Sequence, residues 1–483
     1  MRDTVRFRLD GVLHEVRNPD PTLTVLRYLR ETLTRSGTKE GCAEGDCGAC
    51  TVVVAEQAHG AAVFRAVNSC ILFLPMIDGK TLYTVESLSG PHDALHPVQQ
   101  AMVDCNASQC GFCTPGFVMS LYAHYRNGAD TNEGAICDAL AGNLCRCTGY
   151  GPIVSAAKKM GEYRQIEEVS PAPLDTDGML ALTYVDPHTG AVRKFFAPQT
   201  IVQLGELSEM YPDAVYLAGA TDVGLWVTKR LRVLDTIISV ASVAELRVLS
   251  ETKDTVEIGA GVRYSEAYQA LERLHPDLGE LLRRLGSVQV RNAGTIGGNI
   301  ANGSPIADSV PPLVALGATL GLRKGAAQRM LPLEDFFLAY GKQDRQPGEF
   351  VEKVIVPKLG AQDVFRVYKL SKRFDQDISA VCGAIKFTPD RGIARGVRIA
   401  FGGMAATPKR AKAAEAALEG RPWNEAGVRA AMAALEKDFA PIADMRASAR
   451  YRMEAAKNLL LRAYRETNGE SARVLAEQAM AYE

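Results

Sequence analysis

Hydrophobic and polar residues alternate at the start of the chain in the pattern of a β-hairpin. Residues 5–9 and 12–16 alternate, and Asp10-Gly11 between them is a typical two-residue hairpin turn. The apolar residues that follow are three or four positions apart: Val25, Leu26, Leu29 and Leu33. This spacing predicts a helix over residues 24–34.

Other parts of the chain have helical or mixed patterns. Apolar residues are helically spaced over 117–125, and Pro152 opens another helical stretch over 153–160. From residue 191 to about 360, β-like and helix-like segments alternate, which is typical of an α+β domain. A β-like segment at 396–401 follows, and we predict amphipathic helices over 409–419 and 446–465.

Bulk properties restrict the class of protein. A chain of 483 residues is too long to fold around a single hydrophobic core, so about three or four domains are expected. The formal net charge is −1 with no basic block, which excludes a nucleic-acid partner. Apolar runs such as 71–77 are too short for a membrane span, and the charged Met1-Arg2-Asp3-Thr4 start lacks a signal sequence. We therefore expect a cytoplasmic protein without membrane contact.

The cysteines indicate metal chemistry rather than disulfides. There are eleven, and an odd number without an export signal argues against a disulfide framework. The first set is Cys42, Cys47, Cys50 and, nineteen residues later, Cys70. This C-x4-C-x2-C…C spacing is the plant-type ferredoxin arrangement for a [2Fe–2S] cluster, and the intervening glycines let backbone N–H groups approach the sulfurs. A zinc knuckle is the alternative, although structural zinc sites more often use paired C-x2-C or Cys/His sets.

A second set of four cysteines has a different spacing. Cys110 and Cys113 form C-x2-C, and thirty-one residues later Cys145 and Cys147 form C-x-C. Thiolates at the ends of predicted helices suit an iron–sulfur cluster, and zinc again remains the alternative. The other three cysteines fit small buried hydrophobic residues better than ligands: they are Cys105, Cys137 and Cys382.

Together the two motifs resemble the iron–sulfur region of the molybdenum hydroxylases, the xanthine dehydrogenase and aldehyde oxidase family. The resemblance covers residues 1–165 through GCAEGDCGAC, SQCGFCTPGF and GNLCRCTGYGPI. It implies one [2Fe–2S] cluster in a ferredoxin-like domain and another in a helical domain. It also implies that Gln109 and Cys147 lie close to the pterin of a molybdenum cofactor.

Two glycine-containing loops, 217–224 and 294–302, lie in the middle of the chain. Neither has the G-x-G-x-x-G of a Rossmann site or the Lys-Ser/Thr of a phosphate loop, and the residues alone favour simple turns. The resemblance continues here, because AGATDVG and TIGGNIANGSPIAD are similar to the two FAD-binding loops of the same family. The FAD-binding residues that it implies are Tyr216, Leu217, Ala218, Gly219, Ala220, Thr221, Asp222, Val223, Thr295, Gly298, Asn299, Ala301, Asn302, Asp308, Val351 and Lys369.

One position departs from the family pattern. The family places a Phe against the isoalloxazine ring of the flavin, and the aligned residue here is Leu285. The aromatic contact therefore comes from elsewhere, or the flavin packs differently. Residues 368–378 resemble the loop that borders the flavin in the family and influences whether NAD or oxygen receives the electrons.

These features predict an α+β, multidomain fold. The domains are a plant-type β-grasp 2Fe-2S ferredoxin-like domain over 1–84, a helical 2Fe-2S domain over 85–165, a linker rich in Pro, Asp, Glu and Thr over 166–190, an FAD-binding domain of vanillyl-alcohol-oxidase type over 191–362, and a C-terminal α/β flavoprotein domain over 363–483.

The resemblance implies an electron-transfer subunit like the small subunit of a bacterial xanthine dehydrogenase. Such a subunit takes electrons from a large subunit whose molybdopterin cofactor converts hypoxanthine and xanthine to urate. It passes them through two 2Fe-2S clusters to FAD and then to NAD⁺, in a heterotetramer. No molybdopterin domain follows residue 480, so a separate polypeptide is expected to supply it, and no catalytic side chain is expected here. The alternatives are the equivalent subunit of another molybdenum hydroxylase with an aldehyde or aromatic substrate, a stand-alone diaphorase, and a non-catalytic iron–sulfur redox sensor or assembly protein.

Overall fold

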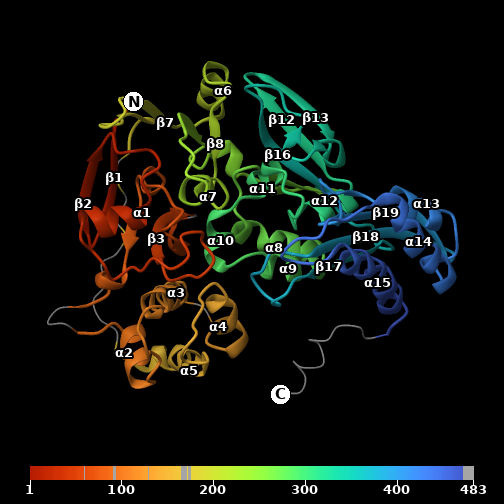
Figure 1. Cartoon of the computed structure of the whole chain (residues 1–483), viewed down its shortest axis with the longest axis horizontal. Coiled ribbons are helices and arrows are strands. Elements are labelled where there is room, and N and C mark those ends of the chain that lie inside the picture. Colours follow the sequence, from red (N-terminus) through yellow and green to blue (C-terminus); the bar gives the residue numbers. More distant parts are fainter. Residues whose placement is uncertain are drawn as a thin grey trace.

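The computed structural model describes residues 1–470 except 59, 91–93, 129, 165–170, 172–173 and 175. Figure 1 shows the N-terminal sheet beside the middle of the chain, the small helical domain against that sheet, and the C-terminal sheet with its helices at the far end. Helices and strands occur in every part but in different proportions, as an α+β multidomain fold requires.

The first domain is a mixed five-stranded sheet in the order β2-β1-β5-β3-β4. Its strands are β1 (Thr4–Leu9), β2 (Val12–Arg17), β3 (Thr51–Ala58), β4 (Ala61–Asn68) and β5 (Thr81–Tyr83). β1 is antiparallel to β2 and parallel to β5. Short 3-10 turns flank β5, η2 (Leu74–Ile77) and η3 (Val85–Ser87). This is the β-grasp arrangement of a ferredoxin.

The predicted hairpin is confirmed. Leu9 lies opposite Val12, and both Asp10 and Gly11 have positive φ angles, as a type I′ turn requires. The helix predicted over 24–34 is α1 (Val25–Arg27), which continues as the π-helical turn η1 (Tyr28–Thr32). Thr24 caps it by accepting the N–H of Arg27.

Four helices make the second domain. They are α2 (Pro97–Asp104), α3 (Thr114–Arg126), α4 (Glu133–Leu140) and α5 (Gly151–Lys159), with a 3-10 turn η5 (Met160–Glu162). The two helices predicted over 117–125 and 153–160 correspond to α3 and α5. The core of this domain continues into the first sheet, because Tyr122 of α3 packs against Phe64 and Tyr83.

The segment predicted as a linker over 166–190 is only partly described, since residues 166–170, 172–173 and 175 lie outside the described residues. Its second half forms strand β6 (Leu180–Val185), in which Leu180 and Leu182 are buried. The mostly apolar run 179–185 marks this strand, and the prediction missed it because the polar residues before it extended the predicted linker to residue 190. β6 lies at the edge of a four-stranded sheet in the order β6-β7-β9-β8, made with β7 (Val192–Ala197), β8 (Val215–Leu217) and β9 (Thr236–Ser239).

A larger antiparallel sheet, in the order β10-β11-β16-β12-β13, completes the middle of the chain. Its strands are β10 (Leu249–Glu251), β11 (Thr255–Gly259), β12 (Thr319–Lys324), β13 (Ala327–Pro332) and β16 (Phe350–Pro357). A short ribbon is made by β14 (Phe337–Ala339) and β15 (Lys342–Gln343). The helices of this region are α6 (Ile201–Met210), α7 (Val223–Thr228), α8 (Tyr264–Leu274), α9 (Pro276–Arg283), α10 (Val288–Ala293), α11 (Ile296–Asn302) and α12 (Val310–Leu316), with 3-10 turns η6 (Ala244–Arg247) and η7 (Leu333–Asp335).

The C-terminal part is an antiparallel sheet backed by helices. Its strands, in order, are β17 (Val364–Leu370), β18 (Val381–Asp390), β19 (Ile393–Gly402) and β20 (Lys409–Arg410), and its helices are α13 (Lys412–Leu418), α14 (Glu425–Asp438) and α15 (Ala449–Thr467). The helix predicted over 409–419 thus begins only at Lys412, because Lys409 and Arg410 pair with β19. No helix among the described residues is long and apolar enough to cross a membrane.

Candidate functional site

The first thiol set lies in a loop that closes against the ferredoxin-like sheet. Cys42, Cys47 and Cys50 lie between the first helix and β3, and Cys70 lies just after β4. Cys50 and Cys70 are buried, whereas Cys42 and Cys47 are partly exposed. The four thiols form two hydrogen-bonded pairs, Cys42 with Cys47 and Cys50 with Cys70.

Backbone donors converge on one sulfur of this set. The amides of Glu44, Asp46 and Cys47 donate to Cys42 Sγ over 3.5, 3.4 and 3.4 Å. The hydrogen bond from the Cys47 thiol and these three amides lower the pKa of Cys42 to about 5. The same thiol–thiol bond, together with burial, raises the pKa of Cys47. Such donors stabilise a thiolate, the form that binds a metal.

The second thiol set lies at helix ends near the surface. Cys113 is the N-cap of α3, and Cys145 and Cys147 lie in the loop before α5. Cys147 Sγ is 3.6 Å from Cys110 Sγ, and Cys113 is hydrogen-bonded to Cys145. The Thr148 amide donates to Cys145 Sγ over 3.4 Å. Cys110 and Cys147 are exposed, so this set is the more accessible of the two.

The pairing of the thiols is informative about the metal. Each set contains two thiol pairs, Cys42 with Cys47 and Cys50 with Cys70 in the first, and Cys110 with Cys147 and Cys113 with Cys145 in the second. Each iron of a [2Fe–2S] cluster takes two protein ligands. Two thiol pairs per set therefore match the two irons of such a cluster.

A direct backbone contact joins the two sets. The Leu144 amide, next to Cys145, donates to the carbonyl of Cys47 over 3.0 Å. The approach is close because Gly48 has no side chain: a Cβ atom there would lie 2.2 Å from the Gly142 carbonyl oxygen. The Asn143 side chain reinforces the contact by donating to the Gly48 carbonyl over 3.1 Å.

A buried glutamine from the middle of the chain completes this junction. Gln289 of α10 is 1 % exposed, and its Nε2 lies 3.1 Å from Thr51 Oγ1, Ser120 Oγ and Asn143 Oδ1. It thereby connects three domains between the two thiol sets. Sequence reasoning missed all four residues, because no pattern in the chain brings positions 51, 120, 143 and 289 together.

The two predicted flavin loops lie against each other. The first connects β8 to α7, and a Cβ atom on Gly219 would lie 1.9 Å from the Ala293 carbonyl oxygen. In the second, Thr295 caps α11 by accepting the Gly298 amide over 2.9 Å. Ala220 of the first loop has a φ of 60°, in the left-handed region that few non-glycine residues adopt. Both loops thus present backbone close to a shared boundary, as a diphosphate-binding region requires.

Helix α7, which follows the first flavin loop, packs on the first thiol set. Leu225 is in contact with the buried cluster of Leu26, Cys50, Cys70 and Ile71. Gly224 again allows the approach, since a Cβ atom there would lie 2.8 Å from the Ile71 carbonyl oxygen. The proposed flavin loop and the first thiol set are therefore neighbours.

A buried ion pair links the second loop to the C-terminal sheet. Lys369 Nζ lies 2.6 Å from Asp308 Oδ2, and it also donates to the Asp377 carbonyl and to Ser379 Oγ. Lys369 and Asp308 are both buried. Asp308 Oδ1 is buried without a partner among the described residues. An unmet polar atom at a predicted flavin residue fits a polar ligand beside it.

The remaining predicted flavin residues differ in their burial and in their hydrogen-bond partners. Asp222 accepts a hydrogen bond from the Trp226 indole over 2.8 Å. Asn299 accepts from the Ser309 hydroxyl over 2.8 Å. Val351 is buried in the core of the domain, whereas Ala301 and Asn302 are exposed. The structure thus brings the two loops and Lys369 together and leaves Ala301 and Asn302 at the surface.

Leu285 is buried in the core, and an exposed aromatic ring, Phe374, lies against its neighbour in sequence, Arg284. The Phe374 carbonyl accepts from Arg284 Nε over 2.9 Å, and the Arg284 guanidinium lies 3.7 Å from the Phe374 ring centroid. From the same loop, Gln376 donates to the Asp46 carbonyl over 2.6 Å. The C-terminal loop thus reaches the first thiol set.

Four domain profiles match the chain in this order. They are a 2Fe-2S iron-sulfur cluster binding domain over residues 7–74, a [2Fe-2S] binding domain over 84–158, an FAD binding domain in molybdopterin dehydrogenase over 190–359, and a CO dehydrogenase flavoprotein C-terminal domain over 366–467.

Named relatives agree with these profiles. Xanthine dehydrogenase of Emericella nidulans is 33% identical over 90% of this chain, and aldehyde oxidase 1 of Rattus norvegicus is 30% identical over 87%. The chain spans 36% of the length of each.

Solved structures agree over somewhat more than half of the chain. A chain of carbon monoxide dehydrogenase from Hydrogenophaga pseudoflava is 29% identical with a TM-score of 0.53, covering 56% of this chain and 94% of that one. One from Oligotropha carboxidovorans is 25% identical with a TM-score of 0.54, covering 57% and 97%. The chain therefore belongs to the molybdenum hydroxylase family and corresponds to its iron–sulfur and flavin portion.

Proposed function

We propose that this chain is the electron-transfer subunit of a xanthine dehydrogenase. It receives electrons from a partner subunit that carries the molybdopterin cofactor and hydroxylates hypoxanthine and xanthine to urate. It delivers them through two [2Fe–2S] clusters and FAD to NAD⁺. The observation that carries the proposal is a pair of contacts along the chain of groups. The loop that holds Cys145 contacts the backbone of Cys47, and the buried cluster that includes Cys70 packs against Leu225 of α7, just after the flavin loop.

The eight cysteines are the proposed cluster ligands. Cys42, Cys47, Cys50 and Cys70 would hold one cluster, and Cys110, Cys113, Cys145 and Cys147 the other. When bound, each cluster carries one electron at a time, and FAD exchanges one or two. The residues of this chain hold and orient these groups. The protein packs the first set against α7 and leaves the second set near the surface.

The exposed rim of the second set is the proposed entry point for electrons. Cys110 and Cys147 are exposed, and the side chains of Phe112 and Tyr150 beside them are 48 % and 40 % exposed. Exposed apolar residues around a redox group are typical of a partner-binding surface. We infer that the molybdenum subunit docks here, with Gln109 next to its cofactor, in a heterotetramer.

The flavin residues are proposed to bind FAD between the two loops and Lys369. Backbone around Gly219 and Gly298 would face the diphosphate, and Asp308 and Lys369 would lie near the isoalloxazine ring. Phe374 replaces the missing aromatic at position 285 as a side chain that can lie against the flavin. Its ring is 41 % exposed and comes from the loop that also contacts Asp46.

A second candidate is the same role with another substrate. Aldehyde oxidase 1 matches this chain at 30% identity, close to the 33% of the xanthine dehydrogenase of Emericella nidulans. The residues that determine substrate specificity would lie on the molybdenum-binding partner. The same iron–sulfur and flavin chain could therefore accept electrons from the oxidation of an aldehyde or an aromatic compound.

The test is to purify the chain with its co-purifying large subunit and measure both composition and activity. Four irons and one FAD per chain are expected from two [2Fe–2S] clusters and one flavin, together with xanthine-dependent NADH formation. Oxidation of aldehydes but not of xanthine would support the second candidate instead. A chain with iron but no FAD and no molybdenum partner would instead point to a redox sensor or assembly protein.

A further inference from the structure

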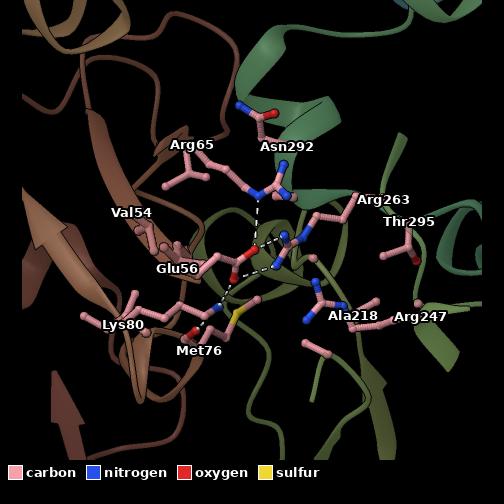
Figure 2. Close-up of a pocket in the computed structure, with 17 residues that line it drawn as sticks. Val54, Glu56, Arg65, Met76, Lys80, Ala218, Arg247, Arg263, Asn292 and Thr295 are labelled. Atoms are coloured by element: carbon pink, nitrogen blue, oxygen red, sulfur yellow. Dashed lines mark hydrogen bonds and ion pairs between the residues drawn. The ribbon is translucent and has the colours of Figure 1, made fainter. Parts of the chain in front are cut away.

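A positively charged cavity lies at the boundary between the ferredoxin-like domain and the flavin domain (Figure 2). Its volume is about 50 Å³. The ferredoxin-like domain contributes Glu56 of β3, Arg65 of β4 and Lys80, which directly precedes β5. The flavin domain contributes Arg247 and Arg263. Figure 2 shows Glu56 at the centre, with its carboxylate facing Arg65, Arg263 and Lys80.

The carboxylates at this boundary do not balance the cations. The four cationic side chains are Arg65, Lys80, Arg247 and Arg263. Among the described residues, only two carboxylates, Glu56 and Glu266, lie within 4 Å of them. Arg65 and Arg263 each contact both, Lys80 Nζ lies 3.8 Å from Glu56, and Arg247 lies 3.4 Å from Glu266. Two positive charges therefore remain uncompensated around the cavity.

The excess charge has an energetic cost. Burial, together with the nearby Arg263, Arg247 and Arg65 guanidinium groups, lowers the pKa of Lys80 to about 8. Burial and the neighbouring Arg263 also lower the pKa of Arg65. Like charges held together away from water destabilise one another unless a counter-ion lies between them.

The size of the cavity limits what could supply that counter-charge. A single water needs about 10–15 Å³ on this scale, so the cavity has room for a few waters or for one tetrahedral oxyanion. A whole nucleotide does not fit, although its terminal phosphate could enter. The guanidinium group of Arg247 suits such an anion because it carries a planar pair of N–H donors. Arg263 adds positive charge, although both of its terminal nitrogens already donate to the Glu56 carboxylate.

We propose that this cavity binds a doubly charged oxyanion, either free phosphate or sulfate or the phosphate group of a nucleotide. The anion lies between side chains of two domains and stabilises their contact. Ala218, Gly219 and Thr295 of the flavin loops also line the cavity. The cavity therefore shares the backbone of Gly219 with the proposed diphosphate site, and phosphate binding to the FAD-loaded chain tests whether the two sites are separate. The inference does not depend on the substrate of the complex.

The experiment uses the whole chain loaded with clusters and FAD. Its thermal midpoint and its calorimetric binding isotherm are measured with phosphate, sulfate, AMP and chloride at equal ionic strength and pH. Phosphate or sulfate is expected to raise the midpoint by several degrees relative to chloride, since a ligand that binds only the folded state stabilises it. Binding of AMP but not of inorganic phosphate would identify a nucleotide as the source.

Variants distinguish a specific anion-binding site from a general effect of salt on stability. Lys80→Gln and Arg247→Gln are expected to weaken phosphate binding about tenfold or more. The matched control is Arg273→Gln, an exposed arginine of the same domain that pairs with Glu251, and it should bind phosphate as the wild type does. Equal midpoints in phosphate and chloride would overturn the proposal. Phosphate binding that is present without FAD and lost with FAD would also overturn it, because the cavity would then be part of the flavin diphosphate site. The proposed electron-transfer function would still hold in that case.

Discussion

The cysteines of this chain differ in surroundings even though their spacing alone singles out eight of them. Cys50 and Cys70 are buried beneath α7, while Cys110 and Cys147 are exposed on the helical domain. Burial away from water and the number of N–H donors both set the potential of an iron–sulfur cluster. We therefore expect two clusters with different potentials, distinguishable by their spectra.

Replacing one ligand should remove one cluster and spare the other. For Cys70→Ser we expect iron to fall from about four to about two per chain, with one of two [2Fe–2S] signals lost from the electron paramagnetic resonance spectrum. Cys137→Ser is the control, because Cys137 is exposed on α4 outside both sets. Unchanged iron in the Cys70 variant would rule out this ligand assignment.

The Lys369–Asp308 pair can be tested separately from the flavin. Lys369→Met leaves the buried Asp308 carboxylate without its cation, so the free energy of unfolding should fall by about 3–5 kcal/mol. Adding Asp308→Asn removes the stranded charge and should restore part of that loss. Lys457→Met, whose partner Glu436 is largely exposed, should lose far less stability than Lys369→Met. Urea unfolding of each variant measures these differences, and equal losses for Lys369 and Lys457 would contradict the argument.

At the scale of elements, the positions of strands and helices followed from residue periodicity where one face is buried. The first hairpin, α3, α5 and β19 lie where alternation or helical spacing predicts them. β6 and β20 were not predicted, because one lies in a segment of linker-like composition and the other is a two-residue strand. The helix predicted over 24–34 covers the turn after α1, but the π-helical form of that turn was not predicted.

The tight packing of the two cluster domains gives a prediction for their connection. Gly48→Ala would place a Cβ atom 2.2 Å from the Gly142 carbonyl oxygen, at a φ of 71°. Because the neighbour is backbone, the two loops must separate. We expect a loss of stability of several kcal/mol and a weaker magnetic coupling between the two reduced clusters.

Gly128→Ala is the matched control for backbone strain alone. Gly128 also has a positive φ, 63°, but a Cβ atom there would meet nothing within 4 Å. It should therefore cost only the local strain of about 1 kcal/mol and leave the coupling between clusters unchanged. Equal effects of the two substitutions would show that strain, rather than the contact with Gly142, determines the result.

At the scale of the whole molecule, the sequence indicates which groups exist but not where they meet. The thiol motifs were visible because ligand spacing is local. The junction at Gln289 was not, since its hydrogen bonds to Thr51, Ser120 and Asn143 span 238, 169 and 146 positions along the chain. Each of these residues is an ordinary polar residue until the domains pack. The unbalanced charges at the domain boundary were hidden for the same reason.

The domain boundary should also respond to acid through Glu56. Burial opposes ionisation of this carboxyl, but Lys80, Arg263 and Arg65 overcome it and hold its pKa well below the usual range. A lowered pKa in the folded protein contributes stability above the unfolded value of about 4.3, and that stability is lost as the pH falls below it. At pH 7, Glu56→Gln should therefore be less stable than the wild type by about 3–5 kcal/mol.

Between pH 5 and pH 3 the two proteins should converge by about 1–2 kcal/mol, because the unfolded wild type takes up a proton at Glu56 while the folded form stays ionised, and the glutamine of the variant cannot titrate. Denaturant unfolding in chloride buffers at both pH values measures the difference, and other carboxylates cancel since both proteins contain them. A difference that stays constant from pH 7 to pH 3 would mean that the Glu56 charge does not stabilise the boundary. In that case the neighbouring cations would have to be balanced in another way, and the anion proposed for the cavity would gain importance as the group that holds the two domains together.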